Sequence, residues 1–237
     1  MKEKKNILVS FSGGLDSTYL LYKNLLEGHN VSICYTEIEN NSSKVIVEKF
    51  CVERIIEELR KDFPGHKITI IDRYNVKIDI VLSNNMCFKQ ILIWLLSLVY
   101  STKTEIDEVH IGITMNDDIN PYINDIKKIW KLYKKFYYNN EKFPKIKFPL
   151  YKTPKYEIVD NLPERYKKLV TYCEDPIIIS QDNNIVEFKN CGNCNACKTY
   201  IFRNFRDIGC GQFNPPLKLA GIPSLSKGKK KKNDQQK

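Results

Sequence analysis

The sequence predicts an α/β fold in which helices cover both faces of a parallel, twisted sheet. Short apolar, β-branched runs alternate along the chain with longer segments of helical periodicity, which is typical of a parallel sheet. At 237 residues the chain is long enough for one or two domains with a substantial core. Parallel sheets bind ligands at the carboxyl ends of their strands, so those ends are where functional residues are expected.

The elements are expected in strand–helix order. Strands are predicted over 7–10, 31–36, 67–71 and 108–113, and helices over 17–26, 44–61, 88–100 and 123–138. Gly28 is expected to cap the first helix. A further helix is expected to start at Thr153-Pro154, with Pro154 at its first position, and to end near Leu162. Residues 177–179 and 185–188 predict a β-hairpin with its turn at 182–184.

The first strand leads into a glycine turn and a helix start. Backbone N–H groups of such a turn and the positive end of the helix dipole suit a phosphate group, and glycines let the backbone approach it closely. Asp16 fits an anion site if Mg²⁺ bridges its carboxylate to the phosphates. The stretch matches neither the Walker pattern nor Gly-x-Gly-x-x-Gly. The predicted nucleotide-binding residues are Ser10, Phe11, Ser12, Gly13, Gly14, Leu15, Asp16, Ser17 and Thr18.

A cluster of cysteines predicts a metal site. Cys191, Cys194 and Cys197 form two overlapping C-x-x-C steps with Gly and Asn between them. The fourth ligand is expected to be Cys173, with Cys210 as the alternative. Zn²⁺ suits four thiolates, and an iron–sulfur cluster is the main competitor. The scattered cysteines Cys34, Cys51 and Cys87 are most simply small buried hydrophobes.

Charge and hydropathy narrow the class of protein. The net charge is +10, of which the stretch 226–237, with six lysines and one aspartate, contributes +5. This lysine tail suggests at most loose nucleic-acid binding, and a solvated terminus is the simpler interpretation. The longest apolar run, 91–100, is too short to span a bilayer. Because the first residues lead directly into a strand, no signal peptide is expected. We expect a cytoplasmic protein that does not associate with membranes.

The loop resembles the Ser-Gly-Gly-x-Asp-Ser pyrophosphate loop of the PP-loop ATP pyrophosphatases. Loop and cysteine cluster together resemble one family, the 7-cyano-7-deazaguanine synthases of the queuosine pathway, with an adenine-nucleotide α-hydrolase-like fold. Residues 171–173 and 191–197 are similar to that family's Thr-x-x-Cys and Cys-Gly-x-Cys-x-x-Cys segments, the first being one residue shorter here. Residues 155–159 resemble its Lys-x-Glu-Ile-Val segment, and 111–117 resemble a strand end that finishes in Asp. The resemblance covers roughly residues 5 to 209.

This resemblance implies an ATP-dependent ligase that converts 7-carboxy-7-deazaguanine and ammonia into a nitrile. One ATP adenylates the carboxylate, ammonia converts the adenylate into an amide, and a second adenylation yields the nitrile. The implied catalytic residues are Asp16, which positions Mg²⁺, together with Ser17 and Lys155, which neutralises developing phosphate charge. Asp117 joins the nucleotide-binding set. ATP, Mg²⁺ and Zn²⁺ are the implied cofactors, and a homodimer is the implied assembly.

The segments implied to hold the acceptor depart from the family pattern. The expected Arg-Asn pair is replaced within 87–90, and no arginine follows Asp118 until Arg165. Tyr200 stands where an arginine is expected, with Arg203 further on. The alternatives are therefore a relative acting on another acceptor, or an ATP-binding subunit of an anti-phage defence system with operon partners. A PP-loop tRNA-modifying enzyme is a further alternative.

The chain is expected to divide into three regions. Residues 1–150 form the predicted PP-loop nucleotide-binding α/β domain. Residues 151–225 form a helical region with the Cys₄ zinc site, and 226–237 a disordered lysine-rich tail.

Overall fold

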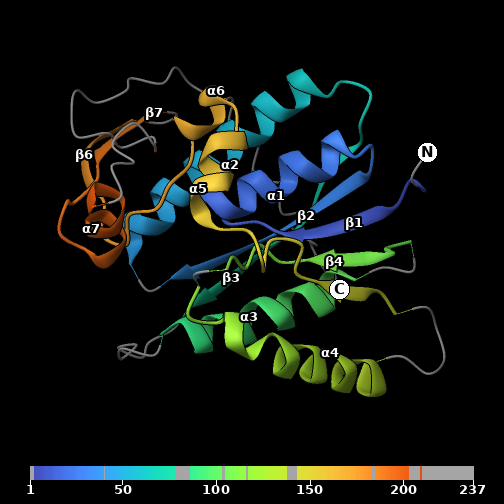
Figure 1. The fold of residues 1–237 in the computed structure, drawn as a ribbon. Helices are drawn as coiled ribbons and strands as arrows, with labels where there is room; N and C mark the ends of the chain where they lie inside the picture. The colour runs from blue at the N-terminus through green and yellow to red at the C-terminus, as the bar shows by residue number, and fades with distance from the viewer. Residues whose placement is uncertain are drawn as a thin grey trace, which may run out of the picture.

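The computed structural model describes residues 3–39, 41–77, 86–102, 105–115, 117–137, 143–182, 185–202 and 209. A five-stranded sheet lies at the centre of the molecule, in the order β3-β2-β1-β4-β5, and every neighbouring pair is parallel (Figure 1). The strands are β1 (Asn6–Ser10), β2 (Asn30–Glu39), β3 (Ile68–Lys77), β4 (Glu108–His110) and β5 (Lys145–Lys147). The predicted fold class is confirmed.

Helices cover both faces of this sheet, as Figure 1 shows. One face carries α1 (Leu15–Leu26), α2 (Ser42–Asp62), α5 (Lys155–Asn161) and α6 (Glu164–Lys167). The other carries α3 (Met86–Ser101) and α4 (Ile123–Tyr137), which follows the short 3₁₀ turn η1 (Asn120–Tyr122). Because the connections after β1 and β4 lie on opposite faces, the carboxyl ends of these neighbouring strands flank a topological switch point, where ligands of open α/β sheets bind.

Each face has its own hydrophobic core. The first cluster joins β1 and β2 to α1 and α2, and also contains Leu150, Ile158, Tyr166 and Tyr200. Residues of both predicted regions, 1–150 and 151–225, therefore share one core, and the division into regions stays a prediction. The second cluster packs α3 and α4 against the other face, and it includes the buried Trp130, whose indole N–H donates to the Pro144 carbonyl.

Beyond the sheet, a hairpin and a last helix hold the cysteines. Strands β6 (Ile177–Asp182) and β7 (Ile185–Lys189) pair antiparallel, which confirms the predicted hairpin, although its turn at 183–184 lies outside the described residues. Val186 and Phe188 of β7 pack on α2. Helix α7 (Asn195–Phe202) follows.

Several boundaries differ from the expected ones: β2 continues to Glu39 rather than ending at residue 36, and β3 continues to Lys77 rather than ending at residue 71. Strand β4 ends at His110 rather than at residue 113, because Ile113 turns back to donate its N–H to the Ile111 carbonyl. Pro154 is the N-cap of α5 rather than its first helical residue. Strand β5 and helix α6 were not expected; both are very short, and β5 consists of one buried isoleucine between two lysines.

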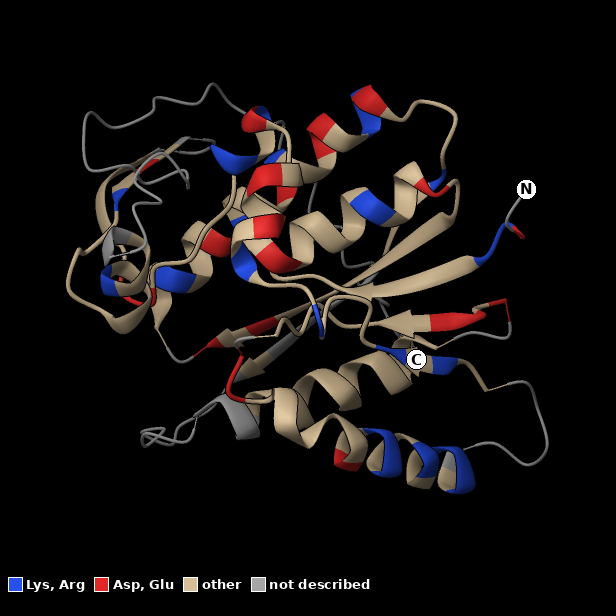
Figure 2. Cartoon of the chain, in the orientation of Figure 1, with Lys and Arg blue, Asp and Glu red and all other residues tan. Residues whose placement is uncertain are grey.

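Surface charge gathers most visibly on α4, whose lysines are coloured blue in Figure 2. Its buried face carries Ile123, Ile126 and Trp130, whereas Lys127, Lys128, Lys131, Lys134 and Lys135 are exposed to solvent. Within the described part of the chain, no helix has the length and apolar character needed to cross a membrane. The tail 226–237 lies outside the described residues.

Candidate functional site

The turn between β1 and α1 is held in shape by its own hydrogen bonds. Gly13 has a φ of 73°, a left-handed conformation that favours glycine, and Gly14 is the N-cap of α1, its carbonyl accepting the Thr18 N–H. The Ser17 hydroxyl donates to the Gly14 carbonyl at 3.1 Å and accepts the Ser12 N–H at 3.4 Å. The first turn of α1 thus begins directly at the loop, as expected from the sequence.

Glycines allow two neighbouring segments to approach this loop. A Cβ on Gly13 would lie 3.1 Å from the Val52 Cγ2 atom of α2. A Cβ on Gly112, just beyond β4, would lie 3.2 Å from the backbone of Asp16 and Ser17. Gly112 was not among the predicted site residues, because the contact joins segments nearly a hundred positions apart and leaves no local signal. The close packing needs glycine at both positions for steric reasons.

A cavity of about 320 Å³ opens beside the loop at the carboxyl ends of β1, β2 and β4. Residues of the 10–17 loop line it together with Asp117 and Asp118 of the 114–118 segment. Of the predicted set, Ser10, Phe11, Ser12, Gly14, Asp16, Ser17 and Asp117 line it. The other lining residues are Thr36, Gln90, Ile91, Trp94, Ile111, Gly112, Ile113, Asp118 and Ile119. Gln90 and Trp94 come from α3, whose apolar sequence signalled a buried helix rather than a site.

The remaining predicted residues lie outside the lining. Leu15 is a core side chain, and Gly13 faces α2. Thr18 is fully buried, and its hydroxyl has no hydrogen-bond partner in the described part of the chain. Lys155 is not a lining residue, and its ammonium pairs with the carboxylate of Asp16, which is one.

Asp16 and Lys155 form an ion pair at the first turn of α1. The Lys155 Nζ atom lies 3.0 Å from Asp16 Oδ2, and their side chains are 18% and 20% exposed. Burial raises the pKa of the Asp16 carboxyl above its usual range; the Lys155 ammonium opposes this shift, and the Asp117 carboxylate adds to it. Asp16 Oδ1 is buried and has no partner among the described residues. A buried carboxylate oxygen without a donor leaves a ligand position that suits Mg²⁺.

The segment after β4 links Asp117 to Lys155. Asp117 Oδ2 accepts the Thr114 N–H at 2.6 Å, and the Met115 N–H donates to the Thr153 carbonyl at 3.2 Å. The Asn120 side-chain amide donates at 2.7 Å to the carbonyls of Thr114 and Tyr151. These bonds fix the start of α5, and with it Lys155, beside the loop.

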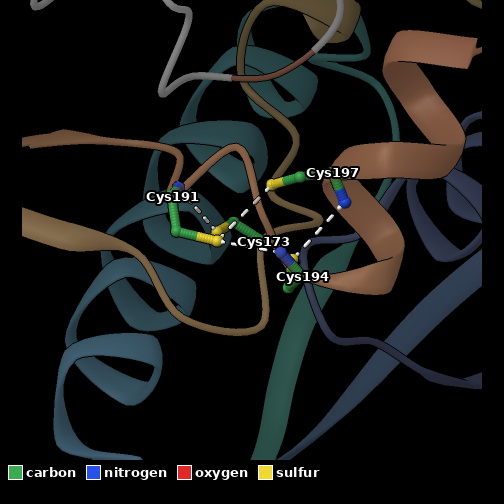
Figure 3. Close-up of side chains that lie close together, drawn as sticks. All are labelled: Cys173, Cys191, Cys194 and Cys197. Carbon is green, nitrogen blue, oxygen red and sulfur yellow. Dashed lines mark hydrogen bonds between the residues drawn. The ribbon is translucent and has the colours of Figure 1, made fainter.

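Four cysteines converge near the N-terminal end of α2, where Asn41 and Lys44 contact the turn that follows Cys173. The sulfurs of Cys173, Cys191, Cys194 and Cys197 all lie within 4.8 Å of one another (Figure 3). The Cys191 and Cys197 sulfurs are 3.9 Å apart. The ligand set predicted with Cys173 is therefore assembled, and Cys210 lies outside the described residues.

Backbone donors surround these sulfurs. Cys191 Sγ accepts the N–H groups of Asn193 and Cys194 at 3.4 and 3.3 Å. Burial opposes ionisation of Cys191, but these donors lower the pKa of its thiol to about 7. Burial raises the pKa of Cys173 to about 11 and also raises the pKa of Cys197. Without a cation the buried thiols would stay protonated, so the donor set fits a bound metal that compensates thiolate charge.

Tyr200, which stands where the family pattern has an arginine, is a packing residue. Its ring stacks on Tyr172 with centroids 3.9 Å apart and an interplanar angle of 10°. It is 6% exposed and belongs to the core. Arg203 lies outside the described residues.

The chain matches the family model described as "Queuosine biosynthesis protein QueC" over residues 6–204. It belongs to this family. The match spans both the loop at Asp16 and the four-cysteine site. No curated protein matches the chain.

Two solved structures resemble the QueC-family fold at low identity. The U34-tRNA thiolase NcsA from Methanococcus maripaludis, solved with its [4Fe-4S] cluster, is 20% identical with a TM-score of 0.46, covering 76% of this chain and 62% of its own. The NMN synthetase from Francisella tularensis is 13% identical with a TM-score of 0.36, covering 69% of this chain and 64% of its own. This chain thus spans less than two thirds of the length of either protein.

Proposed function

We propose that the protein is an ATP-dependent adenylating ligase that converts 7-carboxy-7-deazaguanine and ammonia into 7-cyano-7-deazaguanine. The observation that carries the proposal is the environment of the Asp16 carboxylate. Its buried, partnerless oxygen lies in a cavity at a helix N-terminus, beside a lysine, in a chain of the QueC family. Asp16, Ser17 and Lys155 are the proposed catalytic residues.

The loop would bind the β- and γ-phosphates that leave as pyrophosphate. The N-terminus of α1 offers backbone N–H groups and the positive end of its dipole. The hydroxyls of Ser12 and Ser17 now bond to each other and to the loop, and can turn toward a phosphate oxygen. Asp16 and Asp117 would hold Mg²⁺, which neutralises phosphate charge.

Lys155 is proposed to stabilise charge that develops during transfer. In the structure its ammonium rests on Asp16. A cation held by Asp16 would weaken this ion pair and free the ammonium to face the phosphates, whose negative charge grows as the α–β bond breaks. The acceptor carboxylate attacks the α-phosphorus, pyrophosphate leaves, and ammonia then displaces AMP to form the amide. A second ATP adenylates the amide oxygen, and loss of AMP and a proton leaves the nitrile.

The far side of the cavity would hold the acceptor. Trp94 offers a ring for stacking, and Gln90 and Asp118 offer polar groups for a purine-like edge. No lysine or arginine appears among the described lining residues, so an acceptor carboxylate would rely on Mg²⁺ and Lys155. This charge pattern is the reason for a second candidate function, in which the same chemistry acts on a related but uncharged acceptor.

Sulfur spacing supports Zn²⁺ rather than a cluster in the four-cysteine site. Tetrahedral Zn²⁺ with bonds of about 2.3 Å puts its sulfurs roughly 3.8 Å apart. The Cys191–Cys197 separation of 3.9 Å is close to that value. An iron–sulfur cluster distributes its cysteines over several irons, which separates them further. With four protein ligands the ion would be structural.

A homodimer and a cytoplasmic location complete the proposal. Leu92, Leu96 and Tyr100 lie one turn apart on α3 and are 47%, 42% and 59% exposed. Such a stripe suits contact with a second copy. Leu96→Glu should then shift the mass measured by light scattering from dimer to monomer, whereas Leu132→Glu, a control on α4, should not.

A product assay tests the proposed reaction. The protein is incubated with Mg²⁺-ATP, ammonium and either 7-carboxy-7-deazaguanine or its amide, and products are identified by mass spectrometry. Nitrile from both substrates supports the full reaction, and nitrile from the amide alone supports the uncharged-acceptor alternative. ATP cleavage without either product would move the search to another acceptor. Binding of ATP without cleavage would favour the ATP-binding subunit.

A further inference from the structure

The nucleotide loop and the metal site are joined by one short segment. The Thr171 N–H donates to the Gly13 carbonyl at 3.0 Å. Two residues later the same segment supplies Cys173, and both side chains are buried. Cys173 is therefore linked to the loop by two residues of backbone and one hydrogen bond.

Helix α2 touches both sites as well. Its N-cap Asn41 accepts the Ser43 and Lys44 N–H groups, and its amide donates to Asp175 Oδ1 at 3.0 Å and to the Glu174 carbonyl at 3.3 Å. Two and three turns later, the Glu48 carbonyl and Val52 lie against Gly13. The first turns of α2 thus span the distance from the turn after Cys173 to the loop.

Lys44 is an unusual residue for this position. A cation in the first turn of a helix opposes the helix dipole, and its side chain is only 11% exposed. Its ammonium contacts the carboxylate of Glu174, the neighbour of Cys173, and lies 3.8 Å from the carboxylate of Glu48. The nearby cysteines, if ionised around one divalent ion, carry a net charge of about −2, which a buried cation offsets.

We propose that Lys44 is a positioning residue that couples the metal centre to the nucleotide loop: its buried ammonium fixes the Cys173–Glu174 turn on α2 and offsets thiolate charge. The inference rests on the metal centre and nucleotide loop of the proposed function. Removing the charge should loosen Cys173 and, through Thr171, the loop at Gly13. Metal retention and nucleotide affinity should then change together.

The test compares three variants of the full-length, metal-loaded protein. Lys44→Met keeps the length of the side chain without its charge, and Lys44→Arg keeps the charge. Lys61→Met is the matched control, since Lys61 also pairs with two glutamates, Glu57 and Glu58, at the opposite, exposed end of α2. The readouts are the rate of zinc transfer to a chromogenic chelator, the Kd for Mg²⁺-ATP by calorimetry, and stability in urea.

Lys44→Met should release zinc about 10-fold faster or more, as outer-shell changes at metal sites do, and bind Mg²⁺-ATP at least about 5-fold more weakly. Lys44→Arg should restore both within about 2-fold, a rescue that a purely steric role does not give. Lys61→Met should match wild type in both. If Lys44→Met does not fold, Glu174→Gln, at an exposed carboxylate, should produce a smaller change of the same kind.

Faster zinc release with unchanged ATP affinity would overturn the coupling. Failure of Lys44→Arg to rescue would overturn the role of charge. Wild-type protein that binds neither zinc nor ATP would overturn the proposed function together with this inference. Wild-type protein that binds both, with a Lys44→Met variant indistinguishable from it, would overturn only the inference.

Discussion

Replacing Gly112 with alanine should disturb nucleotide binding through a single methyl group. The new Cβ would lie 3.2 Å from the Asp16 carbonyl carbon and the Ser17 nitrogen, and 3.3 Å from the Asp16 carbonyl oxygen. These neighbours are backbone atoms of the first turn of α1, which cannot move aside as a flexible side chain could. The backbone of Gly112 does not require glycine, because its φ is not positive. The expected effect is therefore steric alone.

Overpacking of this kind costs about 1–3 kcal/mol. The first turn of α1 has to shift by a few tenths of an ångström, and that turn carries Asp16 and the N–H groups proposed to bind phosphate. If about half of the strain falls on the site, roughly 0.5–1.5 kcal/mol, the Kd for Mg²⁺-ATP rises by roughly 2- to 10-fold, since 1.4 kcal/mol corresponds to a factor of ten. The remainder lowers the free energy of unfolding.

Calorimetry with Mg²⁺-ATP measures the loss of affinity, and urea unfolding measures the loss of stability. Gly65→Ala is the control, because an added Cβ there meets nothing within 4 Å and its φ is not positive. Gly65→Ala should leave affinity and stability close to wild type. If Gly112→Ala also left affinity and stability close to wild type, the close approach of Gly112 to the first turn of α1 would be refuted.

Further variants probe the other groups of the two sites. Asp16→Asn should abolish ATP cleavage while circular dichroism shows the fold retained; full activity would disprove the role of the carboxylate. Cys194→Ser should lower zinc content measured by mass spectrometry and reduce the melting temperature, and unchanged values would rule out the metal site. Burial raises the pKa of Glu48 to about 7 from 4.5, so the folded state holds its proton more tightly and stability falls as pH rises between those values. Glu48→Gln should remove up to about 3 kcal/mol of that fall in the free energy of unfolding. If urea unfolding gave wild type and Glu48→Gln the same pH dependence from pH 5 to 8, this prediction would be contradicted.

Patterns that repeat locally predicted most of the fold. The long helices and the strands at 7–10 and 31–36 followed from periodicity, because each buries a regular set of apolar residues. Strand β5 gave no such signal, since only Ile146 of its three residues is buried. The early end of β4 depends on the turn of Ile113 back to Ile111, which the alternating apolar sequence does not reveal.

The candidate site was predicted where its residues are close in sequence. The loop at 10–17 and the cysteine steps at 191–197 carry their chemistry in short spacings. Lys155 was singled out by family resemblance alone, and only the fold brings it within 3.0 Å of Asp16. Gly112, Trp94 and Lys44 were missed, because their importance lies in contacts between segments far apart in the chain.

The most direct test of the central claim is the phosphorus NMR spectrum of a reaction with Mg²⁺-ATP, ammonium and 7-carboxy-7-deazaguanine. A loop at Asp16 that holds the β- and γ-phosphates as the leaving group predicts AMP and pyrophosphate as products, absent with Asp16→Asn. ADP and inorganic phosphate would contradict the account, because they would show cleavage at the other bond.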